Sequence, residues 1–444
     1  MLDLVSAGMV SVWLSLANVS ETLTTTVTEL QETPWLAEPA QTDRTTQALL
    51  QNYLKRLAAK GLAPTTQGVW LQSGPVVLAN NQGTTPLPAA SLTKVATSLV
   101  ALETWGTDHR FDTLISTNGE IQNGVLQGDL IIQGGGDPLF VWEEGFALGN
   151  TLNQMGIRKV TGNLVIVGAF QMNFEVDPRK AGALLQESLN SAKWGDDATY
   201  QYSEMLPPPA KPKVEIAGTV QVLAAGTPMP TEPTALIRHS SLPLAQILKL
   251  MNVNSNNVIS ESLAVMAGGH QVVAQKAAML ANVPPDEILL VNGSGLGVEN
   301  RISPRAVAAM YAVMQRYLEP KGLTIADLFP VSGLDLGTID YRKIPKAAVV
   351  KTGTLNEVSA LAGVLPTRDR GLIWFTIINR GTDLEDLREE QDRFLQQLVT
   401  QWGALPSVPV AIAPQQPGQV VKLLGSPQRN IIQTRPGLAV GNLQ

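Results

Sequence analysis

Cysteine is absent from this chain of 444 residues, and histidine occurs only three times. Without cysteine there is no disulfide framework, no zinc–thiolate site and no cysteine nucleophile. His109, His239 and His270 form no metal-binding spacing. We therefore expect neither a metal nor any other cofactor.

Charge is also scarce. Charged residues make up 16% of the chain and the formal net charge is -6. A basic stripe and a platform of basic and aromatic residues are both missing, so we expect no nucleic-acid binding. The apolar content of 44% is ordinary for a globular protein, while the length exceeds that of one compact core and predicts two or three domains.

The N-terminus lacks a clear export signal. Residues 4–17 are moderately apolar, but Asp3 precedes them and no lysine or arginine occurs before Arg44. A signal peptide normally begins with positive charge, and a spanning helix needs a longer apolar run. Two interpretations of this end stay open: a degraded export signal with its linker, or an amphipathic or disordered arm.

Patterning along the chain predicts a domain interrupted by an insert. Helical spacing of leucines covers 42–60, a strand pair covers 68–79, and short strands with glycine turns dominate 111–235. We predict an N-terminal segment at 1–41, a domain built from 42–110 and 236–403, a β-rich inserted domain at 111–235, and a proline-rich, disordered tail at 404–444.

Three short motifs stand out along the chain. The S-x-x-K motif at 91–94 and the K-T-G motif at 351–353 each occur once, and an S-x-N motif at 255–257 lies between them. This order is the one used by penicillin-reactive serine enzymes. Each motif alone arises easily by chance. Two other S-x-N strings exist, at 116–118 and 188–190, but only 255–257 forms a short joint between two predicted helices.

The S-x-x-K and S-x-N motifs predict a nucleophile, its base and a proton relay. Residues three apart share a helix face, so Lys94 can contact Ser91 and remove its proton. That role requires the lysine pKa to fall by roughly three units from about 10.4. We expect burial beside the second ammonium group, Lys351, to lower it. Ser255 and the amide of Asn257 would face the same cleft.

The third motif predicts an anchor for a substrate carboxylate. A buried strand run leads directly into Lys351 and Thr352, which would offer a cation and a hydroxyl group. Gly353 has no side chain, so a substrate backbone could lie along this strand. The backbone N–H groups of Ser91 and Thr354 are candidate oxyanion donors. A Ser-His-Asp triad lacks support because no G-x-S-x-G elbow occurs, and 293–295 is expected to be a turn.

Further strings accompany the motifs in a fixed order. They are Gly128-Asp129-Leu130, Gly134-Gly135-Gly136-Asp137-Pro138, His239-Ser240-Ser241-Leu242-Pro243-Leu244, Asn292-Gly293-Ser294-Gly295-Leu296 and Lys351-Thr352-Gly353-Thr354-Leu355. With them, the chain from about residue 65 to about residue 380 resembles the D-alanyl-D-alanine carboxypeptidases/endopeptidases of the class C low-molecular-mass penicillin-binding proteins. This resemblance implies an α+β fold: a penicillin-binding/β-lactamase-like transpeptidase domain, with a five-stranded antiparallel sheet between helices, and a β-rich insert.

The same resemblance implies a reaction. A peptidoglycan peptide ending in D-Ala-D-Ala would acylate Ser91 and release its last D-Ala, after which water would free the enzyme. Cleavage of crosslinks would be a second activity, and β-lactams would be covalent inhibitors. The implied catalytic residues are Ser91, Lys94 and Ser255, and the implied substrate-binding residues are Asn257, Lys351, Thr352, Gly353 and Thr354. The implied location is the cell envelope or periplasm, and the oligomeric state stays open.

Two features depart from the family. The stretch between Lys94 and Ser255 is shorter than in the longest members, so one inserted subdomain is expected to be reduced or missing. Gly168 stands where members often carry an acidic residue. Both differences lie outside the catalytic set.

Two other functions stay open. A β-lactamase shares all three motifs, but class A enzymes add E-x-x-L-N after the second motif, where this chain has Glu261-Ser262-Leu263-Ala264. A non-catalytic peptidoglycan-binding envelope protein is the other alternative, and the presence of every catalytic residue argues against it.

Overall fold

The computed structural model describes residues 43–415 and 423–433, apart from 225 and 228–231, so the predicted segment at 1–41 lies outside the described residues. The chain forms two compact units. Unit 1 combines Met1–Gly106 with Leu248–Gly418, and unit 2 combines Thr107–Ile247 with Gln419–Gln444.

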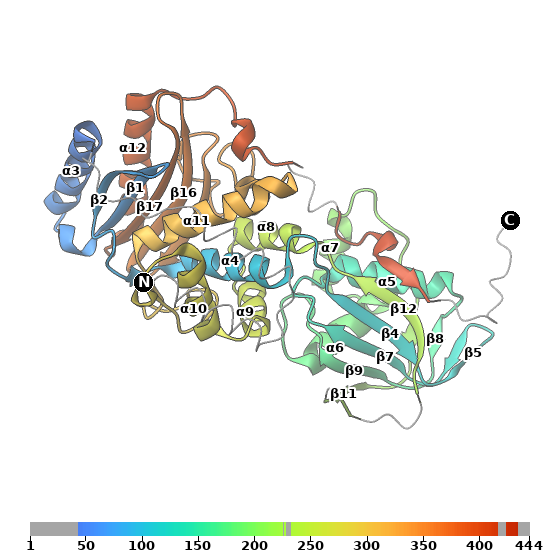
Figure 1. Ribbon diagram of the computed structural model, residues 1–444. Helices are drawn as coiled ribbons and strands as arrows, with labels where there is room; N and C mark the ends of the chain where they lie inside the picture. The colour runs from blue at the N-terminus through green and yellow to red at the C-terminus, as the bar shows by residue number, and fades with distance from the viewer. Residues whose placement is uncertain (1–42, 225, 228–231, 416–422, 434–444) are drawn as a thin grey trace. The chain divides into compact units, whose positions relative to one another are not determined.

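Unit 1 is built on a five-stranded antiparallel sheet with the strand order β15-β16-β17-β1-β2 (Figure 1). Its strands are β1 (Gly68–Ser73), β2 (Val76–Asn81), β15 (Val349–Leu355), β16 (Val358–Thr367) and β17 (Gly371–Arg380). The first two are the strand pair expected from the sequence. Every residue of β16 is buried, because helices cover both faces of the sheet.

Helices flank this sheet on two sides (Figure 1). One face carries α3 (Arg44–Ala59) and α12 (Leu384–Trp402); the other carries α4 (Thr93–Trp105), most of α8 (Leu244–Asn254), α9 (Asn257–Met266), α10 (His270–Ala281) and α11 (Pro304–Leu318). Tyr53 of α3 stacks on Phe394 of α12, with ring centroids 4.8 Å apart, inside a core shared with the sheet. Burying one such aromatic side chain stabilises the fold by roughly 1.5–3 kcal/mol.

Shorter elements complete unit 1. A three-stranded sheet contains β3 (Leu87–Pro88), β13 (Ile288–Leu289) and β14 (Arg301–Ile302). The 3-10 turns are η1 (Pro64–Thr66), η2 (Ala90–Leu92), η4 (Pro285–Glu287), η5 (Glu319–Lys321), η6 (Ile325–Asp327) and η7 (Val410–Ile412).

Unit 2 contains two sheets with the strand orders β11-β9-β7-β4-β12-β18 and β10-β8-β6-β5. The strands are β4 (Asp112–Thr117), β5 (Glu120–Gln122), β6 (Val125–Gln127), β7 (Leu130–Gly135), β8 (Lys159–Val160), β9 (Leu164–Ala169), β10 (Glu215–Ile216), β11 (Val220–Leu223), β12 (Thr234–Ser240) and β18 (Asn430–Ile432). The helices are α5 (Trp142–Gln154), α6 (Pro178–Ser188) and α7 (Asp196–Glu204), with the turns η3 (Ser191–Lys193) and η9 (Pro427–Arg429).

The boundaries of unit 2 differ from the predicted insert at 111–235. Strand β12 pairs with β4, and the last described segment pairs with β12, so that Ile237 faces Ile432. The predicted disorder of the tail at 404–444 is therefore wrong for 430–432, and residues 410–412 form the turn η7. A strand of three residues is too short to show periodicity in a sequence, and its stability comes from its partner strand.

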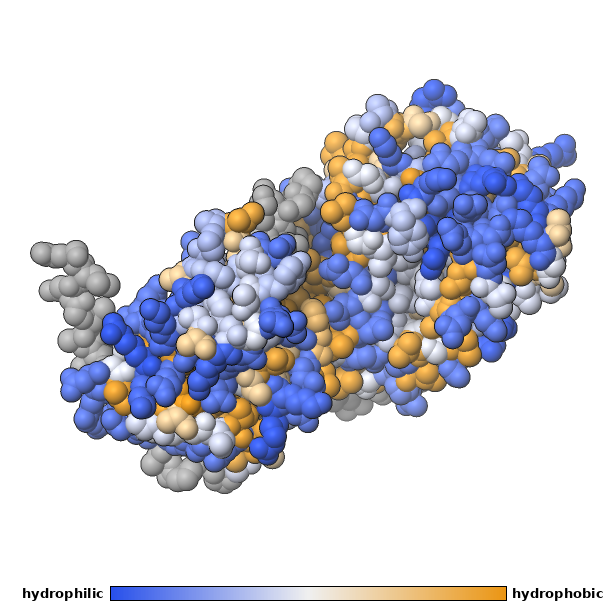
Figure 2. All heavy atoms as spheres, turned by 180° about the vertical axis from the view of Figure 1, so that it is seen from behind, coloured by the Kyte–Doolittle hydropathy of each residue, from blue (hydrophilic) through white to orange (hydrophobic). Residues whose placement is uncertain are grey.

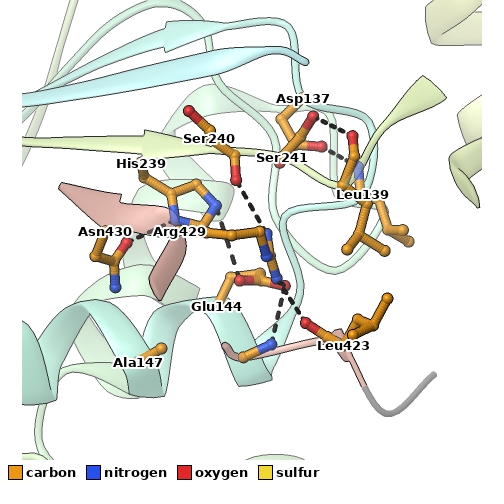
Figure 3. Close-up of polar contacts among 12 residues, drawn as sticks. Asp137, Leu139, Glu144, Ala147, His239, Ser240, Ser241, Leu423, Arg429 and Asn430 are labelled. Carbon is orange, nitrogen blue, oxygen red and sulfur yellow. Dashed lines mark hydrogen bonds and ion pairs between the residues drawn. The ribbon is translucent and has the colours of Figure 1, made fainter. Parts of the chain in front are cut away.

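A partly buried arginine, Arg429, ties this last segment to the rest of unit 2 (Figure 3). Arg429 pairs with the carboxylate of Glu144 and donates hydrogen bonds to the carbonyl oxygens of Ser240 and Leu423, both at 3.1 Å. Glu144, which is 1% exposed, also accepts a hydrogen bond of 3.0 Å from the backbone N–H of Gly425. Removing one partner of such a pair leaves a buried charge uncompensated.

The surroundings of this ion pair are also buried. His239 lies against Asn430, with its Nδ1 2.7 Å from the amide Oδ1, and burial lowers the histidine pKa below its usual value (Figure 3). Burial raises the pKa of Asp137 to about 7. Both groups are thus shifted toward their neutral forms, as low-polarity surroundings require.

Two features of the described residues bear on membrane spanning: their surface and their helices. Figure 2 shows hydrophilic residues interspersed with small hydrophobic groups on one face of both units. Among the described residues, no helix combines the length and the apolar character needed to cross a lipid bilayer.

Candidate active site

The S-x-x-K motif lies where η2 passes directly into α4. Ser91 is partly exposed, whereas Lys94 is fully buried, and the lysine Nζ lies 2.9 Å from the serine Oγ. Ala90, just before the serine, has a left-handed backbone with φ 48°. An alanine is strained in this conformation, and such strain concentrates at functional sites. The turn thus presents the serine hydroxyl beside a buried amine.

Two further oxygen atoms surround this amine. Lys94 Nζ is 2.7 Å from the amide Oδ1 of Asn257 and 2.8 Å from the carbonyl oxygen of Ser294. Burial lowers the pKa of Lys94 to about 7, and the negative charge of Glu261 opposes this shift. An amine with this pKa exchanges its proton near neutral pH, as a general base must.

Burial, more than the neighbouring ammonium group, produces the low pKa of Lys94. We expected burial beside the second ammonium group of Lys351 to lower it; burial is the main cause, and the charge of Lys351 is not among the causes. The repulsion between the two lysines acts on Lys351, whose pKa burial and then the charge of Lys94 lower well below the usual range. Both amines therefore lose their proton, and with it their positive charge, more easily than an exposed lysine.

The S-x-N motif is the joint between α8 and α9, as expected from the sequence. Ser255 has a left-handed φ of 52°, and its Oγ lies 2.9 Å from Nζ of Lys351. The same Nζ donates a 2.8 Å hydrogen bond to the carbonyl oxygen of Thr352. A second serine–lysine pair thus stands beside the first, and the structure brings all three motifs into one site of unit 1.

The K-T-G motif occupies β15, the edge strand of the five-stranded sheet. At Gly353 a Cβ would lie 3.0 Å from the carbonyl oxygen of Ala89 and 3.2 Å from Cβ of Ala90, so only glycine fits easily against the turn before Ser91. The Thr352 hydroxyl lies 2.9 Å from that of Thr338, and Thr354 is exposed. The roles of the Ser91 and Thr354 N–H groups as oxyanion donors stay a prediction.

The turn at 292–295 is a part of the site that the sequence analysis missed. We expected a plain turn there, but its Ser294 carbonyl oxygen accepts a hydrogen bond from the amine of Lys94. Glu261 of α9 holds this turn by accepting 2.9 Å hydrogen bonds from the backbone N–H groups of Gly293 and Ser294. The string Asn292-Gly293-Ser294-Gly295 was visible, but no spacing linked it to Glu261.

These contacts define a class of protein. A partly exposed serine lies beside a buried amine with a pKa near neutrality, and a glycine-bearing edge strand runs past both. Metal-binding clusters of acidic residues and histidine are absent from the described residues. A serine beside an amine that can accept its proton is the pairing of nucleophile and base found in serine acyl-transfer enzymes.

The chain belongs to the D-Ala-D-Ala carboxypeptidase 3 (S13) family, whose model matches residues 55–171 and 212–401. This membership confirms the resemblance inferred from the motifs. It also confirms the predicted enzyme class, a serine-type D-Ala-D-Ala carboxypeptidase.

Two curated relatives illustrate the family. The chain is similar to the D-alanyl-D-alanine carboxypeptidase DacB of Haemophilus influenzae, with 24% identity over 415 residues that cover 71% of this chain and 85% of the relative. It is also similar to carboxypeptidase Rv3627c of Mycobacterium tuberculosis, with 25% identity over 342 residues that cover 66% and 71% of the two chains.

Solved structures confirm the predicted fold class. The penicillin G-acylated predatory endopeptidase Bd3459 of Bdellovibrio bacteriovorus, solved with its immunity protein Bd3460, has a TM-score of 0.68 at 23% identity and covers 79% of this chain and 96% of its own. Penicillin-binding protein 4 (dacB) of Haemophilus influenzae has a TM-score of 0.58 at 19% identity and covers 79% and 99%.

Proposed function

We propose that the protein removes the terminal D-Ala from peptidoglycan stem peptides through an acyl-enzyme formed on Ser91. The observation that carries this proposal is the 2.9 Å separation of Ser91 Oγ and Lys94 Nζ, combined with a lysine pKa of about 7. At neutral pH a large fraction of this amine is uncharged and ready to accept the serine proton.

The reaction then follows in two halves. Lys94 accepts the proton of Ser91 while the serine oxygen attacks the carbonyl carbon of the D-Ala-D-Ala bond. The proton that Lys94 accepted then passes by way of Ser255, which is in contact with Lys351, to the nitrogen of the leaving D-Ala as the amide bond breaks, and Lys94 is neutral again. Water then attacks the ester carbonyl and gives one proton to Lys94, which passes it to the Ser91 oxygen as the ester bond breaks, so that the shortened peptide leaves with a new carboxylate and Ser91 is restored. A positioned base contributes about 10²–10⁴ to such a rate.

Substrate binding is assigned to the edge strand and to the joint between α8 and α9. An extended peptide would lie along β15 at Gly353, with its terminal carboxylate toward the hydroxyls of Thr352 and Thr354. The amide of Asn257 would contact the acyl side of the peptide, while its Oδ1 orients Lys94. Lys351 would hold Ser255 in place for proton transfer by donating a hydrogen bond to its hydroxyl oxygen, and it lies in the strand that binds the substrate.

The same site would accept β-lactams and crosslinked peptides. A β-lactam acylates a serine of this kind because its strained amide takes the place of the D-Ala-D-Ala bond, and the similar protein Bd3459 was solved in a penicillin G-acylated form. Bd3459 is an endopeptidase, which supports a second activity on crosslinks. Such substrates place the protein in the bacterial cell envelope, and we propose the periplasm.

Covalent labelling tests this proposal. Fluorescent penicillin should label the wild-type protein once per chain, and mass spectrometry should locate the label on Ser91. Ser91→Ala should abolish labelling, while Ser116→Ala, a control in another S-x-N string, should label normally. Equal labelling of wild type and Ser91→Ala would reject the proposal. Rapid repeated turnover of nitrocefin would indicate a β-lactamase instead.

A further inference from the structure

A charged hollow lies in unit 1 against the outer side of α12 and the loop at 341–343. It has a volume of about 690 Å³, and its lining includes Tyr341, Arg342, Arg388, Asp392 and Arg393. None of these residues takes part in the acyl-transfer steps above. One of them, Arg388, nevertheless reaches the K-T-G strand.

Arg388 is held between the hollow and the strand end. Its guanidinium nitrogen donates a 3.2 Å hydrogen bond to Oγ1 of Thr354, the residue that follows the K-T-G motif. Its guanidinium carbon lies 5.5 Å from the ring centroid of Tyr341. These two contacts hold the guanidinium at the end of the K-T-G strand.

Arg388 differs from two neighbouring arginines because they form ion pairs with carboxylates. Arg342 pairs with Asp392 at 2.7 Å, and Arg393 pairs with Glu390 at 2.9 Å. Within the described part of the chain, no carboxylate lies within ion-pair distance of Arg388. An unpaired arginine fixed beside an exposed hydroxyl is suited to bind an anion, because its planar N–H groups match a carboxylate.

The hydroxyls of the strand complete such a site. Residues two apart on a strand share a face, so Thr352 and Thr354 present their side chains together. The Thr354 hydroxyl accepts its hydrogen bond from Arg388 and therefore keeps its own hydrogen free for donation. A carboxylate placed there would receive an O–H bond from the threonine and an N–H bond from the arginine.

Lys351 is poorly suited to supply this charge. Its ammonium group is fully buried and already contacts Ser255 Oγ and the Thr352 carbonyl oxygen. The carboxylate anchor expected from the sequence thus lacks a free cation within the K-T-G motif itself.

We propose that Arg388 is a substrate-binding residue that recognises the free terminal carboxylate of the substrate. This inference rests on the proposed function, because it assigns one more contact to the same site. Arg388 then sets specificity: substrates with a free carboxylate beside the scissile bond bind better than those in which it is capped. It takes no part in proton transfer.

Matched pairs of ligands with and without a carboxylate test this assignment. Acylation rate constants are measured for benzylpenicillin and its methyl ester, and kcat and KM for a D-Ala-D-Ala peptide and its C-terminal amide. Arg388→Gln should lower the penicillin rate constant by about 10- to 100-fold, the loss expected for one charge-assisted hydrogen bond, and change the ester rate less than about twofold. For the free peptide KM should rise while kcat stays within about twofold, and Arg388→Lys should recover part of the loss.

The control is Arg393→Gln, on the same helix and in the same hollow, which should leave both ligand pairs unaffected. The inference is overturned if Arg388→Gln slows acid and ester equally, or slows neither. If the wild-type protein reacts with none of these ligands, the proposed function itself fails. An unchanged thermal midpoint of Arg388→Gln, within about 2 °C, excludes misfolding as the cause of a selective loss.

Discussion

At the level of single residues, the proposed reaction makes the reactivity of Ser91 depend on the protonation state of Lys94. Burial holds the pKa of Lys94 near 7, so the amine is charged below that pH and neutral above it. Only the neutral amine can accept the serine proton. The acylation rate by penicillin should therefore rise about tenfold per pH unit below pH 7 and level off above it.

Stopped-flow acylation between pH 5 and pH 9 measures this dependence. Lys55→Arg, an exposed substitution, should keep the wild-type profile, while Lys94→Arg should show no acylation at any pH because arginine stays charged. A wild-type rate that is flat across this range, or that falls as the pH rises, would contradict the role of Lys94 as base.

The sequence was sufficient for some of these residues and not for others. Helical spacing alone brings Lys94 to Ser91, and the helix–joint–helix pattern singled out Ser255. The Ser294 carbonyl oxygen could not be predicted, because it acts through the backbone and any residue type supplies that group. Arg388 could not be predicted either, because only the packing of α12 brings it to Thr354.

At the level of elements, α9 supports the amine of Lys94 through the turn at 292–295. Glu261 on this helix accepts two backbone N–H groups of the turn, and its charge raises the pKa of Lys94. Glu261→Gln keeps the size of the side chain but leaves one oxygen for two donors. The free energy of unfolding should fall by about 1–3 kcal/mol. The pH at which the acylation rate levels off should move to a lower value, because the loss of the negative charge lowers the pKa of Lys94.

Urea unfolding and the same pH series measure these two effects. Glu299→Gln, an exposed change in the same region, is the matched control and should alter neither. A pH dependence of acylation that stays in place or moves to higher pH in Glu261→Gln would show that the carboxylate does not raise the pKa of Lys94 through its charge.

Elements differ in how far a sequence predicts them. The strand pair expected at 68–79 and the strand run expected before Lys351 carry apolar residues between turn residues, and the structure has β1, β2 and β15 there. Strands of two or three residues, such as β3, β13 and β18, contain too few positions to show alternation. Their existence depends on partner strands that are distant in sequence.

At the level of the whole molecule, the chain leaves unit 1 after Gly106 and returns at Leu248, and its last described segment belongs to unit 2. All the proposed catalytic and substrate-binding residues fall within unit 1, while the last described strand belongs to unit 2. A mutant that destabilises only unit 2 should therefore keep the acylation activity of the site in unit 1.

A chain ending at Gly418 makes that separation measurable. The shortened protein lacks β18 and Arg429, so Glu144 loses its ion pair while it stays buried, a change that typically costs about 3–5 kcal/mol. Amide hydrogen exchange should become faster in β12 and α5, and penicillin acylation of Ser91 should stay within about threefold of wild type. Arg429→Met should reproduce the faster exchange in milder form, whereas Arg238→Met, which removes an exposed arginine 3.5 Å from Asp112, should not. If acylation is lost together with the protection of unit 2, the site of unit 1 depends on the second unit, and the assignment of the chemistry to unit 1 alone fails.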